Sequence, residues 1–136
     1  MRLGVLVVLV AVAFSSVPAS AAARPVYVRI AIVGAGLAVK PVEIALSVHG
    51  SLSLDKLHWT SWGDAVATAG GRARVRGCVP DCNLGGLKWP RARVRLSDLV
   101  RCEGRLVYGR LGYALSGEIP AGVERRGRID MLPRGC

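Results

Sequence analysis

The chain has 136 residues, with 19 basic and 9 acidic side chains and a formal net charge of +10. This length suits one domain with one hydrophobic core and excludes an enzyme that joins a doubly wound cofactor domain to a substrate domain. The basic balance favours anionic partners, such as cell-wall polymers, acidic lipid, nucleic acid or acidic glycans. The alternative is that the arginine-rich composition reflects a GC-rich coding sequence and that the arginines are simply solvated.

The first 23 residues have the pattern of a secretory signal peptide, which predicts an N-terminal signal helix. Arg2 provides the positive start, and residues 3–14 form an apolar run without charge. Residues 19–21 and 21–23 fit the small-x-small rule for cleavage, and the apolar run is shorter than the ~20 residues of a membrane-spanning helix. We therefore expect export of a single secreted domain, residues 24–136. Without Arg2 it keeps 18 basic and 9 acidic residues, a formal charge of +9.

Strand patterns dominate the rest of the chain. Alternating β-branched residues are punctuated by glycine and proline, and no amphipathic helix of three or more turns is evident. About seven short strands are expected, at residues 26–33, 42–48, 52–59, 72–79, 87–96, 105–115 and 123–132. Pro90 makes the fifth irregular or an edge strand. The sequence predicts an all-β domain, either a small β-sandwich or a barrel.

All four cysteines, Cys78, Cys82, Cys102 and Cys136, lie in the expected secreted domain. An even number of cysteines in an exported chain favours disulfides over free thiols or a metal site. Cys78 and Cys82 are separated by three residues that include Pro80, which fits neither a zinc site nor a two-residue redox motif. We expect Cys78 to pair with Cys82 and Cys102 with Cys136; alternatively, an unpaired Cys136 bridges two chains. No metal or cofactor is predicted.

Residues 30–39 contain Gly34-Ala35-Gly36 and superficially match a dinucleotide-binding fingerprint. Val39 occupies the third glycine position, and Pro41 would stop the required helix one turn after it begins. A strand–turn–strand arrangement is the better interpretation.

Few residues suggest catalysis. The two histidines are His49 and His58, and a triad could be drawn from Ser61, His58 and Asp64. Neither a nucleophile elbow nor an oxyanion glycine pair accompanies Ser61, and the scattered acids do not suggest a carboxylate pair. We predict that the protein is not an enzyme. The alternative is a small secreted hydrolase or inhibitor with no recognisable site.

Two tryptophans, Trp59 and Trp62, mark the most distinctive stretch. Residues three apart cannot share a face on a regular strand. We expect Trp59 to face the core at the end of a strand and Trp62 to lie in a turn closed by Gly63. An aromatic core is favoured over an aromatic platform for a sugar or a base.

Two runs of alternating arginines are the strongest functional lead. They are Arg72, Arg74 and Arg76, and Arg91, Arg93 and Arg95. Each run places its arginines on one face of a strand. Direct pairing would set like charges opposite one another, so either the strands do not pair or an anion relieves the repulsion. The guanidinium fork suits phosphate and carboxylate groups. For the runs themselves, the preferred interpretation is a solvated outer face whose arginine stems cover apolar atoms. The first functional hypothesis is a secreted, non-enzymatic domain that binds an anionic cell-envelope polymer or surface through these arginines.

Several short motifs together carry a family resemblance. They are Leu-His-Trp-Thr-Ser-Trp-Gly at residues 57–63, Gly70-Gly71, Cys78-x-Pro-x-Cys82, Cys102 and Tyr108. In these motifs the chain resembles a family of small secreted actinobacterial proteins of unknown function, over roughly residues 41–132. The family usually has a further cysteine before the tryptophans, where this chain has none; this chain instead has Cys136. The resemblance implies export and a compact domain, and it implies no activity.

Overall fold

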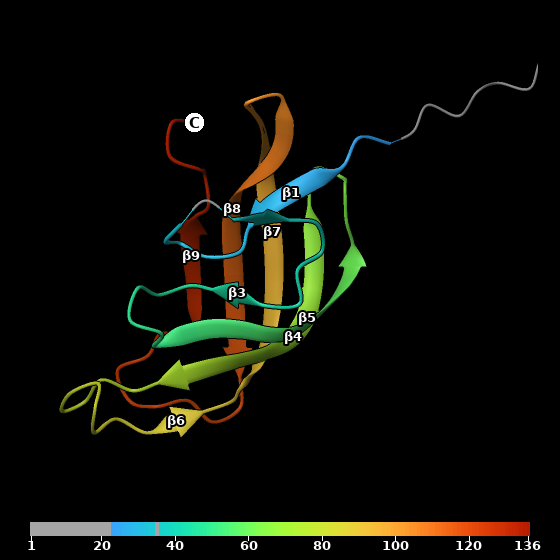
Figure 1. Cartoon of the computed structure of the whole chain (residues 1–136). Coiled ribbons are helices and arrows are strands. Elements are labelled where there is room, and N and C mark those ends of the chain that lie inside the picture. The colour runs from blue at the N-terminus through green and yellow to red at the C-terminus, as the bar shows by residue number, and fades with distance from the viewer. Residues whose placement is uncertain (1–22, 35) are drawn as a thin grey trace, which may run out of the picture.

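The computed structural model describes residues 23–34 and 36–136, so the expected signal segment lies outside the described part, apart from its last residue. The described residues form nine strands and no helix, which confirms the predicted all-β class (Figure 1). Consequently, no helix in this part is long and apolar enough to cross a membrane. The strands are β1 (Val26–Arg29), β2 (Leu37–Ala38), β3 (Ile44–Ala45), β4 (Leu52–Ser61), β5 (Ala67–Arg76), β6 (Leu87–Lys88), β7 (Arg91–Cys102), β8 (Arg105–Ser116) and β9 (Arg126–Asp130).

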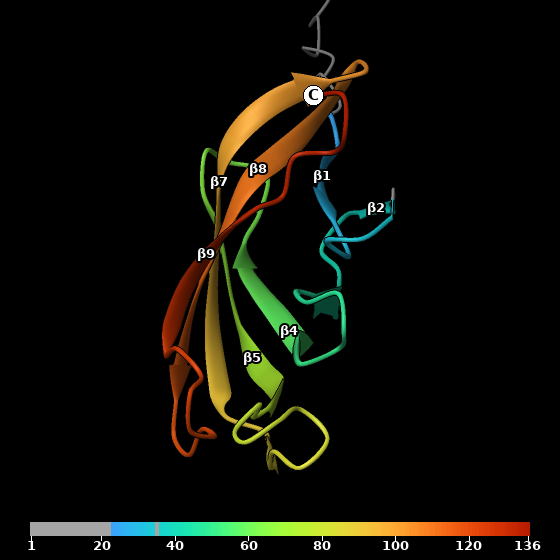
Figure 2. The same cartoon turned by 90° about the vertical axis from the view of Figure 1, so that its left-hand side faces the viewer.

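The strands form one curled, mixed sheet in the order β2-β1-β8-β7-β5-β4-β3, with β6 paired to β5 and β9 paired to β8. The pairing of β1 with β8 is parallel, and the other pairings of named strands are antiparallel. Figure 1 shows β3 and β4 crossing in front of β7, β8 and β9, and Figure 2 shows the same curl from the side. The result is a half-barrel, so the barrel was the closer of the two expected architectures.

The strand bounds differ from the expectation chiefly around glycine and proline. Pro90 divides the expected strand at residues 87–96 into β6 and β7. Yet β7 is central, between β5 and β8, and the edge placement considered for it is wrong. Because Pro90 lies between the two strands, its missing N–H removes no ladder bond, and its carbonyl accepts from the Ala73 N–H at 3.0 Å. The strand expected at residues 72–79 begins earlier, at Ala67, and includes Gly70 and Gly71.

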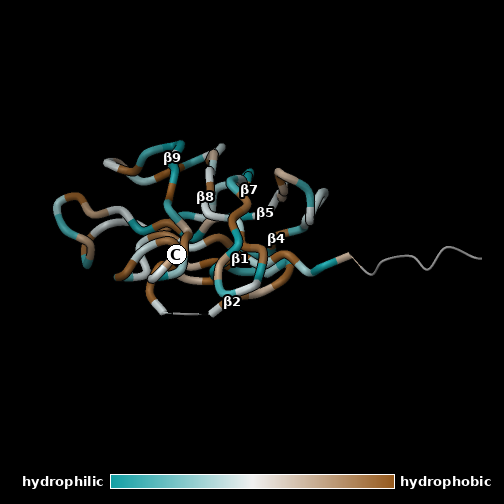
Figure 3. The backbone as a smooth tube through the Cα atoms, turned by 90° about the horizontal axis from the view of Figure 1, so that it is seen from above, coloured by the Kyte–Doolittle hydropathy of each residue, from teal (hydrophilic) through white to brown (hydrophobic). Residues whose placement is uncertain are grey.

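Alternation along the central strands creates the core. One face of β5, β7 and β8 carries small and aliphatic residues that are buried, whereas the other face carries exposed side chains. The buried residues of this face are Ala67, Ala69, Ala73, Val75, Ala92, Val94, Leu96, Leu111 and Leu115. Figure 3 shows hydrophobic segments of several strands meeting in the middle of the molecule. We call the opposite face of β5, β7, β8 and β9 the outer face.

Gly71 lies where β5 passes the irregularity in β4. A Cβ at this position would come within 2.7 Å of the Asp55 carbonyl oxygen and 2.9 Å of the Lys56 carbonyl oxygen. We therefore expect Gly71→Ala to lower the free energy of unfolding by about 1–3 kcal/mol, measured by urea titration, because backbone must move. The neighbouring Gly70→Ala is the matched control, since a Cβ there meets nothing within 4 Å. Equal stability of the two variants would contradict this account of Gly71.

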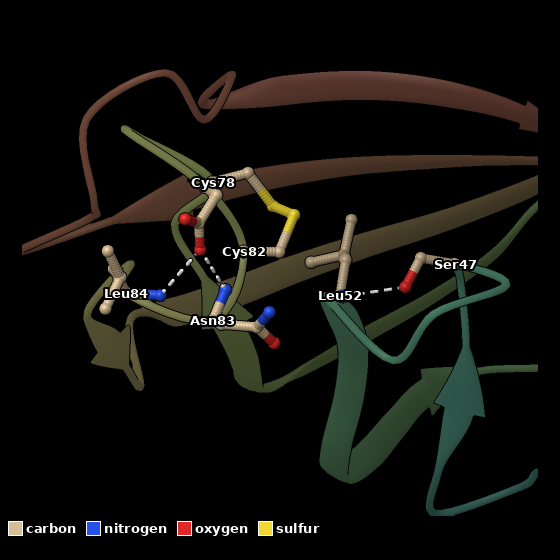
Figure 4. The surroundings of a disulfide bond; sticks show 7 residues. Ser47, Leu52, Cys78, Cys82, Asn83 and Leu84 are labelled. Atoms are coloured by element: carbon tan, nitrogen blue, oxygen red, sulfur yellow. Dashed lines mark hydrogen bonds between the residues drawn. A yellow bond between two sulfur atoms is a disulfide. The ribbon is translucent and has the colours of Figure 1, made fainter.

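Two disulfides join the pairs expected from the sequence, Cys78 with Cys82 and Cys102 with Cys136. The first closes an exposed loop between β5 and β6, in which the Asp81 carboxylate accepts the N–H groups of Asn83 and Leu84 (Figure 4). The second connects the end of β7 to the last residue of the chain. Among the described residues, no cysteine is free.

A buried arginine anchors both ends of the described chain. Arg29 on β1 is only 7% exposed, and its guanidinium donates to the carbonyl oxygens of Leu132 (2.8 Å), Ile32 (2.7 Å) and Gly34 (3.2 Å). Its Nε is buried without a hydrogen-bond partner in the described part of the chain. The charge is thus compensated by carbonyl dipoles, and Arg29 joins β1 to the segment that follows β9.

Candidate anion-binding face

Both arginine runs lie on the outer face, because β5 and β7 pair directly. Their register differs from the expectation that like charges would oppose one another along the runs. Only Arg72 and Arg91 are directly opposite, whereas Arg93 faces Gly70 and Arg95 faces Thr68. The offset between the runs therefore permits direct pairing with one like-charge contact. Arg74 and Arg76 lie beyond the start of β7, next to β4 and β6.

A groove on this face lies over β8 and extends across β7 to β5 and β4. In two neighbouring cross-strand rows, one arginine on β7 and one on β9 flank a small residue on β8. The rows are Arg95–Gly112–Arg128 and Arg93–Ala114–Arg126. Because adjacent strands are about 4.8 Å apart, the two arginines of a row start about 10 Å from each other, and the small residue leaves the space between them open. These six residues line much of an open groove of about 950 Å³, which we call the arginine groove.

The arginine groove is strongly positive. Its four arginines are exposed, and within residues 23–34 and 36–136 none of them forms an ion pair within 4 Å. The ion pairs found there join other residues: Lys88 with Glu118 at 2.6 Å and Arg110 with Asp98 at 3.2 Å. Glu124 is the only acid among the residues that line the groove. Together with burial, which is the larger cause, its charge raises the pKa of Tyr113.

From the sequence, only two of the four arginines of this groove were identified, Arg93 and Arg95. Arg126 and Arg128 were not singled out, although Arg126-Gly127-Arg128 has the same alternation as the two runs that were. The weak apolar pattern of the last strand concealed the signal. Pairing with β8 places both side chains on the outer face, opposite Ala114 and Gly112.

Trp59 and Trp62 are core residues. An irregularity in β4 between Trp59 and Ser61 brings the two rings to the same side, where they pack edge to face with centroids 4.6 Å apart. Their indole N–H groups donate to the carbonyls of Pro41 (2.8 Å) and Val26 (3.1 Å). Trp62 also packs on the buried Tyr108, with centroids 5.4 Å apart. The pKa of Tyr108 is raised chiefly by its burial.

The residues considered for catalysis are not assembled into a triad. Ser61 Oγ bonds with Thr68, and the Asp64 carbonyl accepts from the Tyr108 hydroxyl. His49 is exposed in the turn before β4. His58 does share a hollow of about 460 Å³ with Asp55 and Glu43, but among the described residues no serine or threonine hydroxyl hydrogen-bonds to His58. In that same part of the chain, no cluster of potential metal ligands is found.

Comparisons with known proteins identify no family for this chain. No protein-family model matches the chain, and no curated protein or solved structure is detectably similar to it.

Proposed function

We propose that this protein is an exported, non-enzymatic domain that binds an anionic polymer of the cell envelope on its outer face. The observation that carries this proposal is the arginine groove, in which four arginines without an ion-pair partner among the described residues flank a floor of Gly112 and Ala114. The signal-like N-terminal sequence supports export, and two disulfides are consistent with an oxidising, extracellular environment.

The arrangement suits a linear anion better than a single small one. Successive arginines on one strand face are about 6.6 Å apart along the strand, so the two rows present charge at regular intervals. Guanidinium groups bind carboxylate, phosphate and sulfate oxygens in a planar, bidentate geometry. Side chains of β7 and β9 would contact the polymer from both sides, while the small residues of β8 let it approach the backbone.

Replacing all four groove arginines with glutamine is expected to weaken binding to a polyanion about 100-fold at low salt. The four are Arg93, Arg95, Arg126 and Arg128. Inorganic polyphosphate and heparin serve as probes, and affinity is titrated by fluorescence anisotropy across a salt series. For a polymer as densely charged as duplex DNA, the loss of four contacts lowers the log–log salt slope by about 3–4.

A control variant removes the same charge elsewhere. Arg24, Arg101, Arg105 and Arg134 are exposed and lie outside the groove, and replacing them with glutamine should weaken binding only several-fold. Equal losses in the two variants would show that total charge, and not the groove, determines affinity. Absence of salt-sensitive binding by the wild-type protein would refute the proposal itself.

A third variant tests the shape of the groove without changing its charge. A Cβ at Gly112 meets its nearest atoms at 3.9 Å, an ordinary contact, and β-branched residues favour strands. Gly112→Thr should therefore leave the fold intact while it fills the floor between Arg95 and Arg128. Unchanged affinity in this variant would mean that the polymer does not enter the groove.

A further inference from the structure

Trp89 differs from the two other tryptophans of the chain. Its side chain is 53% exposed, whereas Trp59 and Trp62 pack against the core. Within the described residues, it is the only aromatic side chain among the exposed large hydrophobic ones. It follows β6 and precedes the buried Pro90, whose ring restricts the backbone of the preceding residue. The indole is thus presented to solvent from a restricted segment of backbone.

Trp89 lies in a hollow that adjoins the arginine groove. The hollow has a volume of about 410 Å³ and is lined by Arg72, Lys88, Trp89, Arg91, Ser116 and Glu118, among others. Arg91 pairs with Ser116 one row beyond Arg93 and Ala114, about 6.6 Å further along β7. Groove and hollow are therefore consecutive sections of one track on the outer face. The directly opposed Arg72 and Arg91 lie in the hollow, where an anion would relieve their repulsion.

The chemistry of the hollow favours a sugar ring over a nucleobase. A flat indole accepts the C–H face of a pyranose, while the hydroxyl groups at the ring edge need polar partners. Ser116 and the Lys88–Glu118 ion pair provide such partners beside Trp89. Single-stranded nucleic acids instead stack successive bases on several aromatic side chains. In the described part of the chain, Trp89 is the one aromatic among the exposed large hydrophobic side chains, which fits a single ring contact.

We propose that the polymer is an acidic polysaccharide, one sugar ring of which stacks on Trp89 while its acidic groups bind Arg72, Arg91 and the arginine groove. This inference rests on the proposed polyanion binding and specifies its ligand class. Polymer recognition then has two components, a charge-dependent one along the groove and a charge-independent one at Trp89.

Trp89→Leu tests the second component alone. The variant should bind heparin or polygalacturonate about 5- to 10-fold more weakly than the wild type, and Trp89→Phe should restore most of the difference. Binding of inorganic polyphosphate, which has no sugar ring, should not change. Polysaccharide should also alter the tryptophan fluorescence of the wild type, and this change should vanish in Trp89→Leu.

The possible results separate the two proposals. If polyphosphate and polysaccharide both bind but Trp89→Leu affects neither, the sugar contact is wrong and polyanion binding stands. If Trp89→Leu weakens binding of oligo(dT) as much as that of polysaccharide, the indole stacks on bases and the proposed ligand class is overturned. If the wild type binds no polyanion, both proposals fail.

Discussion

Replacing Cys102 and Cys136 with alanine is expected to lower the free energy of unfolding by about 4 kcal/mol. The bridge spans a sequence separation of 34, and a cross-link over such a loop removes much conformational entropy from the unfolded chain. It also holds the segment after β9, whose Met131 is fully buried and donates its N–H to the Gly109 carbonyl at 2.9 Å. Denaturant titration of the oxidised proteins measures the difference.

The Cys78–Cys82 bridge is the internal control for this prediction. It spans a separation of only 4 in an exposed loop, so the same entropy argument assigns it about 2 kcal/mol. Removing the short bridge should therefore cost roughly half as much as removing the long one. A reversed order would contradict the entropy argument, because the stabilisation would then not increase with the length of the closed loop.

Arg29→Met is expected to lower the free energy of unfolding by about 3 kcal/mol. Two effects oppose each other. Removing the buried charge relieves its desolvation, which favours the variant. The loss of three hydrogen bonds leaves the carbonyls of Ile32, Gly34 and Leu132 without this donor. This effect is the larger one and destabilises the variant. Urea titration with circular dichroism at constant pH measures the net change.

Arg29→Lys separates charge from geometry. Lysine keeps the charge, but its compact ammonium cannot span the three carbonyls as the guanidinium does. If geometry is decisive, this variant loses at least as much stability as Arg29→Met; near-wild-type stability would show that charge alone suffices. Because Arg29 and Cys136 hold the same segment, removing both should cost less than the sum of the single effects.

The sequence allowed prediction of the all-β class and the cysteine pairs because neither prediction requires knowledge of the strand partners. Strand alternation and turn residues are recognised within a few positions, and four cysteines allow only three pairings. Strand partners are not local. Pro90 indicated an interruption, but the central position of β7 depends on pairing with β5 and β8, which no short window reveals.

The candidate site was predicted only in part, because its assembly also depends on which strands pair. Alternation placed each arginine run on one strand face, and the structure unites the two runs on one sheet face. The offset of the runs, the floor at Gly112 and Ala114, and the contribution of β9 all follow from register. A shift of one residue would turn every one of these side chains to the other face. Trp89 was overlooked because its exposure depends on how β6 and β7 flank it.

The parallel pairing of β1 with β8 bears on how the chain reaches its native state. Arg29 and its acceptor Leu132 are 103 positions apart, so this region forms only after a very large loop has closed. Proteins dominated by such distant contacts fold slowly, over milliseconds to seconds. The β4–β5 and β7–β8 hairpins can form early, because their partners are close in sequence. Until β1 docks, the edge of β8 at Leu106 and Val107 has no parallel neighbour and is open to pairing with another unfinished chain.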